Sequence, residues 1–238
     1  MSCYLTGRMQ RVKLDGHVYS DWRIVRTGVP QGSLLGPLLF NIYIDDLNYE
    51  ITNTSLQLYA DDTTDYASDA SPLVLEYVIH SDFSILSSWF RQNYLEINSA
   101  KTQAMAIGPK LYHYDFLVNN KSVDSTETLE ILGVTLDRKL NFMHHVKEQV
   151  KKACAKATDL RRIRKFIPID VMGRLYKAFI LPHLEYCGPL LLGVGNTQAN
   201  KLEDTNYYIL RSILGFGRQT PYEFLLKTVG ISAGNFRP

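Results

Sequence analysis

The chain has 238 residues, of which 45% are hydrophobic and 21% charged, and its 26 basic residues nearly balance its 24 acidic ones. This length can bury the core of one large domain or two small ones, and the composition is ordinary for a globular protein. Three widely spaced cysteines exclude a disulfide framework and predict a reducing, intracellular compartment, cytoplasmic or nuclear. We find no signal-peptide pattern, and the longest apolar run, residues 34–47, is too short to span a membrane.

The first fifty residues predict a β-hairpin, a glycine-rich loop and a helix. Asp15-Gly16 stands between alternating segments, which is a strong hairpin signal. In the loop that follows, residues 28–36, glycines recur at four-residue intervals around Pro30, so that a flat ligand could approach the backbone. The helix should start between Ser33 and Gly36. Residues 38–47 are apolar nearly all round, which predicts a buried helix.

Residues 55–69 predict a second hairpin with two carboxylates at its turn. Alternating apolar and polar residues lie on both sides of Asp61-Asp62. Adjacent like charges repel, so an exposed pair can gather divalent cations, although aspartates are also common in ordinary turns. We expect Asp65 and Asp69 to be solvated residues of the strand and the following loop.

A long helix and short strands should complete the first half. Ser71-Pro72 is typical of a helix start, and the apolar residues of 75–90 recur with helical spacing, so this helix can cover one face of the hairpin. Residues 102–107, 111–118 and 129–136 are strand candidates. Together these elements predict an α+β fold.

After Asn141, a plausible helix cap, the pattern is helical throughout. An apolar stripe marks residues 146–163, and shorter helices are expected at 171–179, 202–214 and 221–229. Residues 147–165 carry a net charge of +6, whereas the whole chain carries +2. The adjacent His144 and His145 diverge on a helix and should be surface residues, so no zinc site is predicted.

Two segments together resemble core motifs of reverse transcriptases of non-LTR (LINE-type, jockey-like) retrotransposons. They are Gly28-Val-Pro-Gln-Gly-Ser-Leu-Leu-Gly-Pro-Leu-Leu-Phe40 and Tyr59-Ala-Asp-Asp62, and their order and spacing make the signal specific. The resemblance extends to residues 89–102 and 132–137, and more weakly to the helical remainder.

The resemblance implies a polymerase palm, an antiparallel sheet with helices on one face, over residues 1–140. It implies a helical thumb or connection region over residues 141–238. In such enzymes the palm strand with the first catalytic aspartate, and the fingers, precede the first hairpin. Nothing in this sequence matches that strand, so the family pattern places it before Met1 and predicts an incomplete palm.

The resemblance also implies how metal would be held. Asp61 and Asp62 would be catalytic ligands of Mg²⁺ or Mn²⁺, the ions that promote phosphoryl transfer in two-metal sites. The third carboxylate that such a site needs is not found. Asp45-Asp46 is a tempting substitute, but the pair fits helix-end polarity as well.

Further residues receive roles by the same resemblance. Gln31 and Gly32 would lie against the incoming nucleotide and Tyr59 beside the primer end, although a plain turn and core packing would also explain them. Lys101 matches a lysine that assists the leaving pyrophosphate, unless it is simply a solvated cation. Leu132 and Gly133 match the segment that grips the primer, with Gly133 allowing close approach of the backbone.

The basic helix resembles the thumb that holds the template–primer duplex. Its candidate phosphate contacts, which would be independent of base sequence and sensitive to salt, are Lys147, Lys151, Lys152, Arg161 and Arg162. The other interpretation is an ordinary solvated helix face.

The sequence thus predicts a segment of an RNA-directed DNA polymerase that would use an RNA template, a DNA primer and deoxynucleoside triphosphates. On this prediction the segment alone is inactive, or another chain supplies the missing strand and fingers. The alternative is an inactive retrotransposon remnant that acts at most as a nucleic-acid-binding module.

Overall fold

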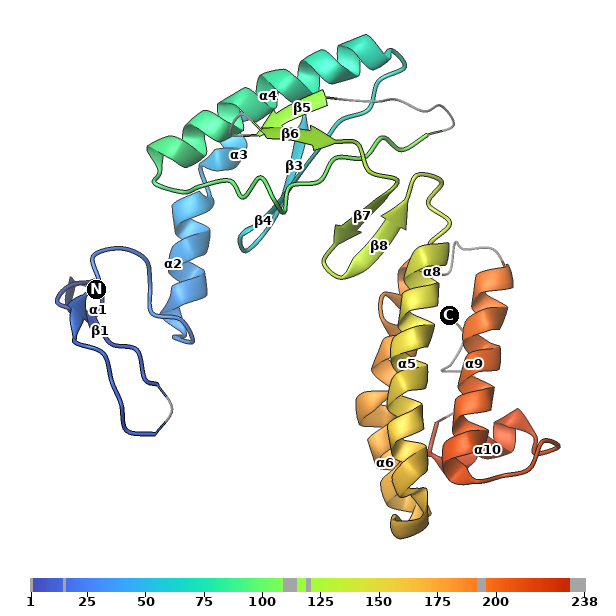
Figure 1. The fold of residues 1–238 in the computed structure, drawn as a ribbon. Coiled ribbons are helices and arrows are strands. Elements are labelled where there is room, and N and C mark those ends of the chain that lie inside the picture. Colours follow the sequence, from blue (N-terminus) through green and yellow to red (C-terminus); the bar gives the residue numbers. More distant parts are fainter. Residues whose placement is uncertain (1, 15, 109–114, 119–120, 192–195, 232–238) are drawn as a thin grey trace. The chain divides into compact units, whose positions relative to one another are not determined.

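The structure, a computed structural model, describes residues 2–14, 16–108, 115–118, 121–191 and 196–231 (Figure 1). The chain forms two compact units, residues 1–98 and 99–238. The boundary at residues 140–141 that the sequence predicts between palm and thumb lies inside the second unit, and the palm and thumb assignments stay predictions.

The first unit combines helices with two hairpins. Its elements are α1 (Ser2–Leu5), β1 (Met9–Gln10), β2 (Arg23–Ile24), α2 (Leu35–Ile44), α3 (Leu47–Glu50), β3 (Ser55–Tyr59), β4 (Asp62–Tyr66) and α4 (Pro72–Gln92). Both predicted hairpins are present, β1 with β2 and β3 with β4. The predicted start of the long helix is also confirmed, because Ser71 is its N-cap and Pro72 its first residue.

Helix α4 covers one face of hairpin β3–β4, as the sequence predicts (Figure 1). Leu56 and Leu58 of β3 pack against a cluster that contains Leu86 and Trp89 of α4. Leu47 of α3 is fully buried in the same cluster. These contacts fix the hairpin to the helix through its apolar face and leave the opposite face free for polar residues.

The predicted burial of helix 38–47 is wrong. Helix α2 buries only Gly36 and Ile44, and Leu38 and Ile42 are 53% and 64% exposed. The helix also ends at Ile44, and the short α3 follows as a separate element. Leu38 and Ile42 of α2 therefore face solvent in the part of the chain that the structure describes, whereas Phe40 and Ile44 belong to the cluster of Leu86 and Trp89.

The second unit starts with hairpins and continues with helices. Its elements are β5 (Asp115–Val118), β6 (Lys121–Asp124), β7 (Thr128–Ile131), β8 (Val134–Asp137), α5 (Met143–Ile163), the 3₁₀ helix η1 (Arg164–Phe166), α6 (Ile169–Phe179), α7 (Leu181–Glu185), α8 (Gly188–Leu191), α9 (Asn196–Leu214) and α10 (Tyr222–Thr228). The four helices predicted after Asn141 correspond to α5, α6, α9 and α10, whereas the short α7 and α8 were not predicted.

The predicted strands of this unit need correction. Residues 129–136 are not one strand but a hairpin, β7–β8, with a turn in the middle. In the predicted strand 102–107 only Ala104 forms a bridge, with Ser125. Of the predicted strand 111–118, residues 115–118 form β5, and residues 111–114 lie outside the described part.

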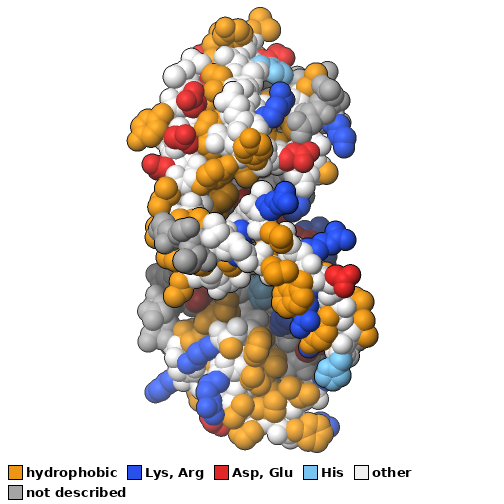
Figure 2. Space-filling view, turned by 90° about the vertical axis from the view of Figure 1, so that its left-hand side faces the viewer, with side chains coloured by type: hydrophobic (Ala, Val, Ile, Leu, Met, Phe, Trp, Pro, Cys, Tyr) orange, Lys and Arg blue, Asp and Glu red, His pale blue; other side chains and the backbone are white. Residues whose placement is uncertain are grey.

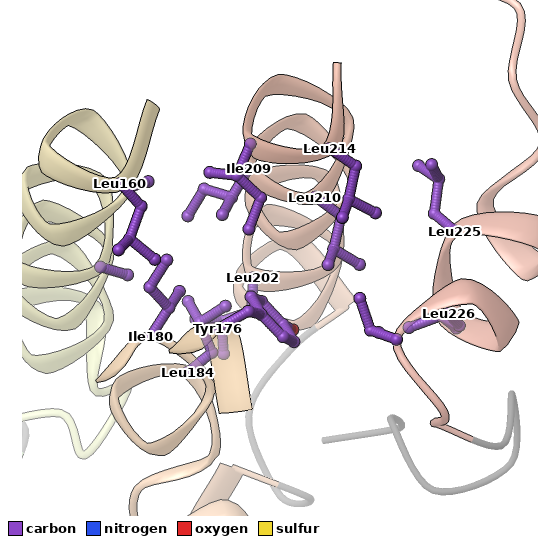
Figure 3. Packing of buried hydrophobic residues seen from close by; sticks show 14 of the residues in the cluster. Leu160, Tyr176, Ile180, Leu184, Leu202, Ile209, Leu210, Leu214, Leu225 and Leu226 are labelled. Atoms are coloured by element: carbon purple, nitrogen blue, oxygen red, sulfur yellow. The ribbon is translucent and has the colours of Figure 1, made fainter. Parts of the chain in front are cut away.

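One large apolar core holds the helices of the second unit together (Figure 3). It includes Leu160 of α5, Ile180 beside α6, Leu210 of α9 and Leu226 of α10. A buried polar chain crosses this core. The Tyr176 hydroxyl donates to Asn206 Oδ1 over 2.6 Å, and Asn206 Nδ2 donates to the Tyr222 hydroxyl over 2.8 Å. Because each group is satisfied, this chain fixes the register of α6, α9 and α10.

The structure is a mixture of helices and small antiparallel sheets, which agrees with the predicted α+β class. Among the described residues the strands form four separate two-stranded sheets rather than one continuous sheet. Cys154 and Cys187 are free thiols. Within the described ranges, none of the helices has the length and apolar character needed to cross a bilayer.

Candidate functional site

The two predicted metal-binding carboxylates lie at the tip of hairpin β3–β4. Tyr59 pairs with Asp62, so Ala60 and Asp61 form a two-residue turn. Ala60 has a positive φ of 52°, as the first central residue of a type II′ turn does. Both Asp61 and Asp62 are exposed. The turn therefore presents two adjacent carboxylates to solvent, where a cation or a substrate can reach them.

The two faces of this hairpin have different environments. Cross-strand partners share a face, so Thr63 and Asp65 lie on the apolar side with their partners Leu58 and Leu56. Tyr59 lies on the other side and is 67% exposed. Core packing, the alternative explanation for this tyrosine, is therefore wrong. Its role beside a primer end stays a prediction.

Asp65 is not the solvated residue that the sequence predicts. Its side chain is half-buried and Oδ1 has no solvent exposure. Burial raises the pKa of the Asp65 carboxyl, and the charge of the neighbouring Asp82 raises it further. Asp69, in contrast, is an exposed loop residue as predicted, and its Oδ1 accepts a hydrogen bond from the Ser71 amide at the start of α4.

Asp82 of α4 holds the start of the hairpin and was not identified from the sequence. It is fully buried. Its Oδ2 accepts hydrogen bonds from the backbone amides of Asn53 and Thr54, each over 2.8 Å, and its Oδ1 accepts one from Asn53 Nδ2 over 2.7 Å. Burial would raise the pKa of this carboxyl, but the hydrogen bonds from Asn53 and Thr54 outweigh it and lower the pKa. Asp82 is thus an ionised anchor for β3.

The glycine-rich loop adopts a tight turn that ends in a helix. Gly32 has a φ of 78°, and a β-carbon added to it would meet no atom within 4 Å, so its surroundings are open. Ser33 Oγ donates to the Pro30 carbonyl over 2.8 Å and accepts from the Gly36 amide over 3.1 Å. Helix α2 therefore begins where the sequence predicts. Gln31 and Gly32 are exposed, and their contact with a nucleotide stays a prediction.

The donor set at the hairpin tip suits magnesium in kind but not in number. Carboxylate oxygens are ligands that Mg²⁺ prefers, and one or two of them with water and phosphate are a common set. Among the described residues, however, no three His, Cys, Asp or Glu side chains come together as a metal site. Asp45 and Asp46 are exposed between α2 and α3, which fits helix-end polarity.

The predicted primer-gripping residues form the turn of hairpin β7–β8. Leu132 and Gly133 have φ values of 48° and 78°, the pattern of a type I′ turn. The Tyr186 hydroxyl donates to the Leu132 carbonyl. A side chain at Gly133 would meet this hydroxyl at 3.4 Å. Tyr186 of the same chain therefore occupies the space next to Gly133 on the side where a β-carbon would lie.

His145 also contacts this hairpin, and its predicted surface position is wrong. It is only 1% exposed, whereas His144 is exposed. Its Nδ1 lies 3.4 Å from the Thr135 amide, and its ring is 6.2 Å from that of Tyr186. Burial lowers the pKa of His145, and the nearby Lys152 charge acts in the same direction. A neutral imidazole thus packs between α5 and the hairpin.

We expect Gly133→Ala to destabilise the second unit by about 1 kcal/mol, because an L-residue at this φ is strained by about that amount. Thermal unfolding followed by circular dichroism at 222 nm measures the change. Gly188→Ala is the control, since Gly188 has neither a positive φ nor an atom within 4 Å of the added carbon. Equal melting temperatures for the two variants would contradict the strained turn.

Comparison with known proteins identifies the family. Residues 2–136, more than half of the chain, match the family model described as reverse transcriptase (RNA-dependent DNA polymerase). The chain belongs to the reverse transcriptase family. It is 25% identical to the RNA-directed DNA polymerase from mobile element jockey of Drosophila melanogaster over 224 residues. The aligned region covers 89% of this chain and 24% of that relative.

Other relatives give the same assignment. The jockey polymerase of Drosophila funebris is 26% identical over 225 residues, which cover 88% of this chain and 24% of that relative. The probable RNA-directed DNA polymerase from transposon BS of Drosophila melanogaster is 28% identical over 178 residues, 68% of this chain and 19% of that relative. The chain thus spans about a quarter or less of the length of these relatives. No solved structure matches it.

Outside the matched region, α5 of this reverse transcriptase segment carries the predicted basic surface. All five candidate phosphate contacts, Lys147, Lys151, Lys152, Arg161 and Arg162, are exposed. At 3.6 residues per turn, four of them fall within an arc of about 100° opposite the buried stripe, and Lys152 lies to one side. Lys151 pairs with Glu148 at 3.7 Å and Arg162 with Asp159 at 4.0 Å, and both ion pairs are exposed and therefore weak.

Two basic residues outside that set have different positions in the reverse transcriptase segment. Arg164 donates from Nη1 to the Ser212 carbonyl over 3.1 Å, and its guanidinium lies against Gly215, so it braces the end of α9. Lys101 is exposed in a turn near the start of the second unit. Its catalytic role stays a prediction.

Proposed function

We propose that this chain is the palm and thumb portion of an RNA-directed DNA polymerase from a non-LTR retrotransposon. The observation that carries the proposal is the exposed Asp61-Asp62 turn of hairpin β3–β4 in a chain of the reverse transcriptase family. A pair of carboxylates at a rigid turn is the kind of group that holds the metal of phosphoryl-transfer enzymes. The reaction would add deoxynucleotides to a DNA primer on an RNA template.

In this proposal the residues of the chain position the reactants. Asp61 and Asp62 hold a divalent cation, and the base of their hairpin is fixed by the ionised Asp82. Tyr59, on the solvent face beside the turn, lies against the primer end. The open loop at Gln31 and Gly32 receives the nucleotide. When bound, Mg²⁺ or Mn²⁺ would lower the pKa of the primer 3′-hydroxyl and neutralise charge on the triphosphate.

We further propose that this set of carboxylates is insufficient alone. A two-metal site needs ligands from more than one strand, and the described residues gather no third metal-binding side chain. Asp65 does not supply it, because it lies on the α4 side of the hairpin near Asp82. A further carboxylate, with the fingers, would come from polypeptide other than the described residues, either in the same protein or in a partner chain.

The exposed basic face of α5 favours a second candidate, a nucleic-acid-binding module without catalysis. Sequence-independent phosphate contacts need only exposed Lys and Arg side chains and no metal. This function would persist in a retrotransposon remnant whose active site is incomplete.

Primer extension on an RNA template separates the two candidates when the chain is tested together with the polypeptide that supplies the further carboxylate and the fingers. If the chain extends a primer, we expect Asp61→Ala to reduce the rate by at least about 1,000-fold, since metal ligands act directly on the transition state. Asp204→Asn, a change at an exposed aspartate of α9, should extend as the unchanged chain does. No extension, together with retained duplex binding in a filter assay, would favour the binding module.

A further inference from the structure

The N-terminal hairpin of the first unit is a two-stranded ribbon whose register shifts by one residue between the pairs Gln10–Arg23 and Lys13–Tyr19. Beyond the β1–β2 pairs, the Val25 amide donates to the Arg8 carbonyl, the Ser20 amide to the Val12 carbonyl and the Leu14 amide to the Val18 carbonyl, each over 2.9 Å. Arg8 also donates to the carbonyls of Thr27 and Gly28, so the ribbon is tied to the start of the glycine-rich loop. Hydrogen bonds therefore join its two strands at several points between Arg8 and Leu14.

The side chains of this ribbon are exposed although many of them are apolar. None of them belongs to the buried clusters of the described residues. The large exposed ones are Met9, Val12, Leu14, Val18, Tyr19, Trp22 and Ile24, with exposures from 41% to 66%. Figure 2 shows hydrophobic side chains lying among Lys and Arg side chains on the face that it presents. An isolated two-stranded ribbon is only marginally stable in water, and an exposed apolar patch commonly marks a binding site. We therefore expect this surface to bind a ligand or a partner.

The most specific feature of the ribbon is a stack of two aromatic rings around an arginine. The Arg11 guanidinium carbon lies 3.9 Å from the centre of the Tyr19 ring and 4.6 Å from that of the Trp22 ring. The two aromatic side chains remain 41% and 54% exposed. Arg11 thus holds two aromatic rings in place while about half of each side chain stays open to solvent.

The charge of the ribbon indicates the class of ligand. Residues 8–26 contain five basic and two acidic residues, a net charge of +3. Arg11, Lys13, Arg23 and Arg26 are all exposed. Aromatic rings flanked by basic side chains are the shared feature of surfaces that bind single-stranded nucleic acid, where bases stack on the rings and phosphates contact the cations. The net positive charge around the rings favours a polyanion over an apolar protein segment.

We propose that this ribbon binds single-stranded nucleic acid by stacking bases on Trp22 and Tyr19. The inference rests on the proposed function in one respect, since the strand it would hold is the unpaired template of the polymerase. The ribbon is distinct from α5, which would bind the duplex. Arg11 contributes a positive charge and a planar guanidinium that stacks on both rings, so a lysine would replace only the charge.

Tryptophan fluorescence tests the proposal in the full chain. The only two tryptophans are Trp22, which is 54% exposed, and Trp89, which is 6% exposed. Titration with a 12-nucleotide oligouridine should quench the emission of Trp22. Trp22→Phe should bind within about threefold of the unchanged chain, followed by anisotropy of a labelled oligomer, because it keeps an aromatic face. Trp22→Leu should bind about 10-fold more weakly, the loss of one stacked base. Arg11→Lys should also weaken binding.

The comparison of leucine with phenylalanine makes the test decisive. Both side chains are apolar and position 22 is exposed, so neither change should unfold the chain, which circular dichroism can verify. Equal affinities of the two variants for the oligomer, or no quenching at all, would overturn the proposal, and equal affinities would favour an apolar protein partner. Failure of the proposed function would appear separately, as loss of duplex binding and primer extension while the quenching by the oligomer remains.

Discussion

Asp82→Ala should destabilise the first unit by about 3 kcal/mol. The change leaves the amides of Asn53 and Thr54 and the side-chain amide of Asn53 without their acceptor, in a place where the aspartate is fully buried. Each hydrogen bond to a charged acceptor contributes about 1.5–3 kcal/mol, and water that reaches the exposed Asn53 recovers part of this. Both tryptophans belong to the first unit, so urea unfolding followed by their fluorescence reports on this unit alone.

Matched variants separate the hydrogen bonds from the volume of the side chain. Asp82→Asn keeps the shape and one acceptor oxygen, so we expect it to destabilise less than alanine does. Glu76→Ala, on the same helix, is the control for a lost acidic side chain. If Asp82→Ala and Glu76→Ala shift the urea midpoint equally, Asp82 is not the anchor of the hairpin.

The pH dependence of the same unfolding transition gives a second test of the anchor. The pKa of Asp82 is lowered in the folded state, so its stabilisation is present above the unfolded value of about 3.9 and is lost as the pH falls through the folded value. The unchanged chain should therefore lose stability below about pH 4 more steeply than Asp82→Asn does. Parallel curves for the two proteins would contradict an ionised, hydrogen-bonded Asp82.

Asp65 should behave in the opposite direction. Its pKa is raised by burial and by Asp82, so its favourable contribution is present at low pH and is lost as the pH rises through the folded value. Asp65→Asn removes a partly desolvated charge and its repulsion with Asp82, and we expect a first unit that is more stable at pH 7. Asp69→Asn, at an exposed loop position, should not share this gain.

Local signals in the sequence predict the elements of the candidate site well. The alternation around Asp61-Asp62 gives hairpin β3–β4, Ser71-Pro72 gives the start of α4, and Ser33 with Pro37 gives the start of α2. Each of these features depends on residues that lie close together in the sequence. The two motifs also suffice for the family, which the match over residues 2–136 confirms.

Features that depend on contacts between distant segments were not predictable in this way. Asp82 lies 28 and 29 residues from its partners, and nothing in its helix distinguishes it from a solvated aspartate. The same holds for Tyr186, which reaches a turn 54 residues away. The burial of His145 had a weak local signal, since it adjoins the buried Val146 and lies one turn before the buried Gln149.

The opposite error concerns α2 and shows what composition cannot decide. An all-apolar helix is normally buried, yet Leu38 and Ile42 are exposed. The apolar pattern predicts which residues favour burial, but it does not predict which other segment of the chain packs against them. The strands after residue 100 show a related limit, because residues 129–136 alternate like one strand while Leu132 and Gly133 turn the chain back.

Neutralising the outer face of α5 should weaken duplex binding about 100-fold at physiological salt. The variant replaces Lys147, Lys151, Arg161 and Arg162, which are exposed within one arc of the helix, by glutamine. Glutamine is nearly as good a helix former as lysine or arginine, so the helix should persist. If each side chain neutralises one phosphate, the slope of log affinity against log salt falls by about three to four. Anisotropy of a labelled RNA–DNA duplex at several salt concentrations measures both quantities.

A control of equal charge tells local phosphate contacts from general attraction. Lys139, Lys201, Arg218 and Lys227 are exposed in the same unit but outside α5, and their replacement by glutamine changes the net charge by the same amount. Long-range attraction depends on total charge and is screened within about 8 Å at physiological salt, whereas contact with phosphate depends on position. Only the α5 variant should therefore lose the salt-dependent part of the affinity. Equal losses in both variants would mean that α5 is an ordinary solvated helix, and the duplex would then have to be held elsewhere.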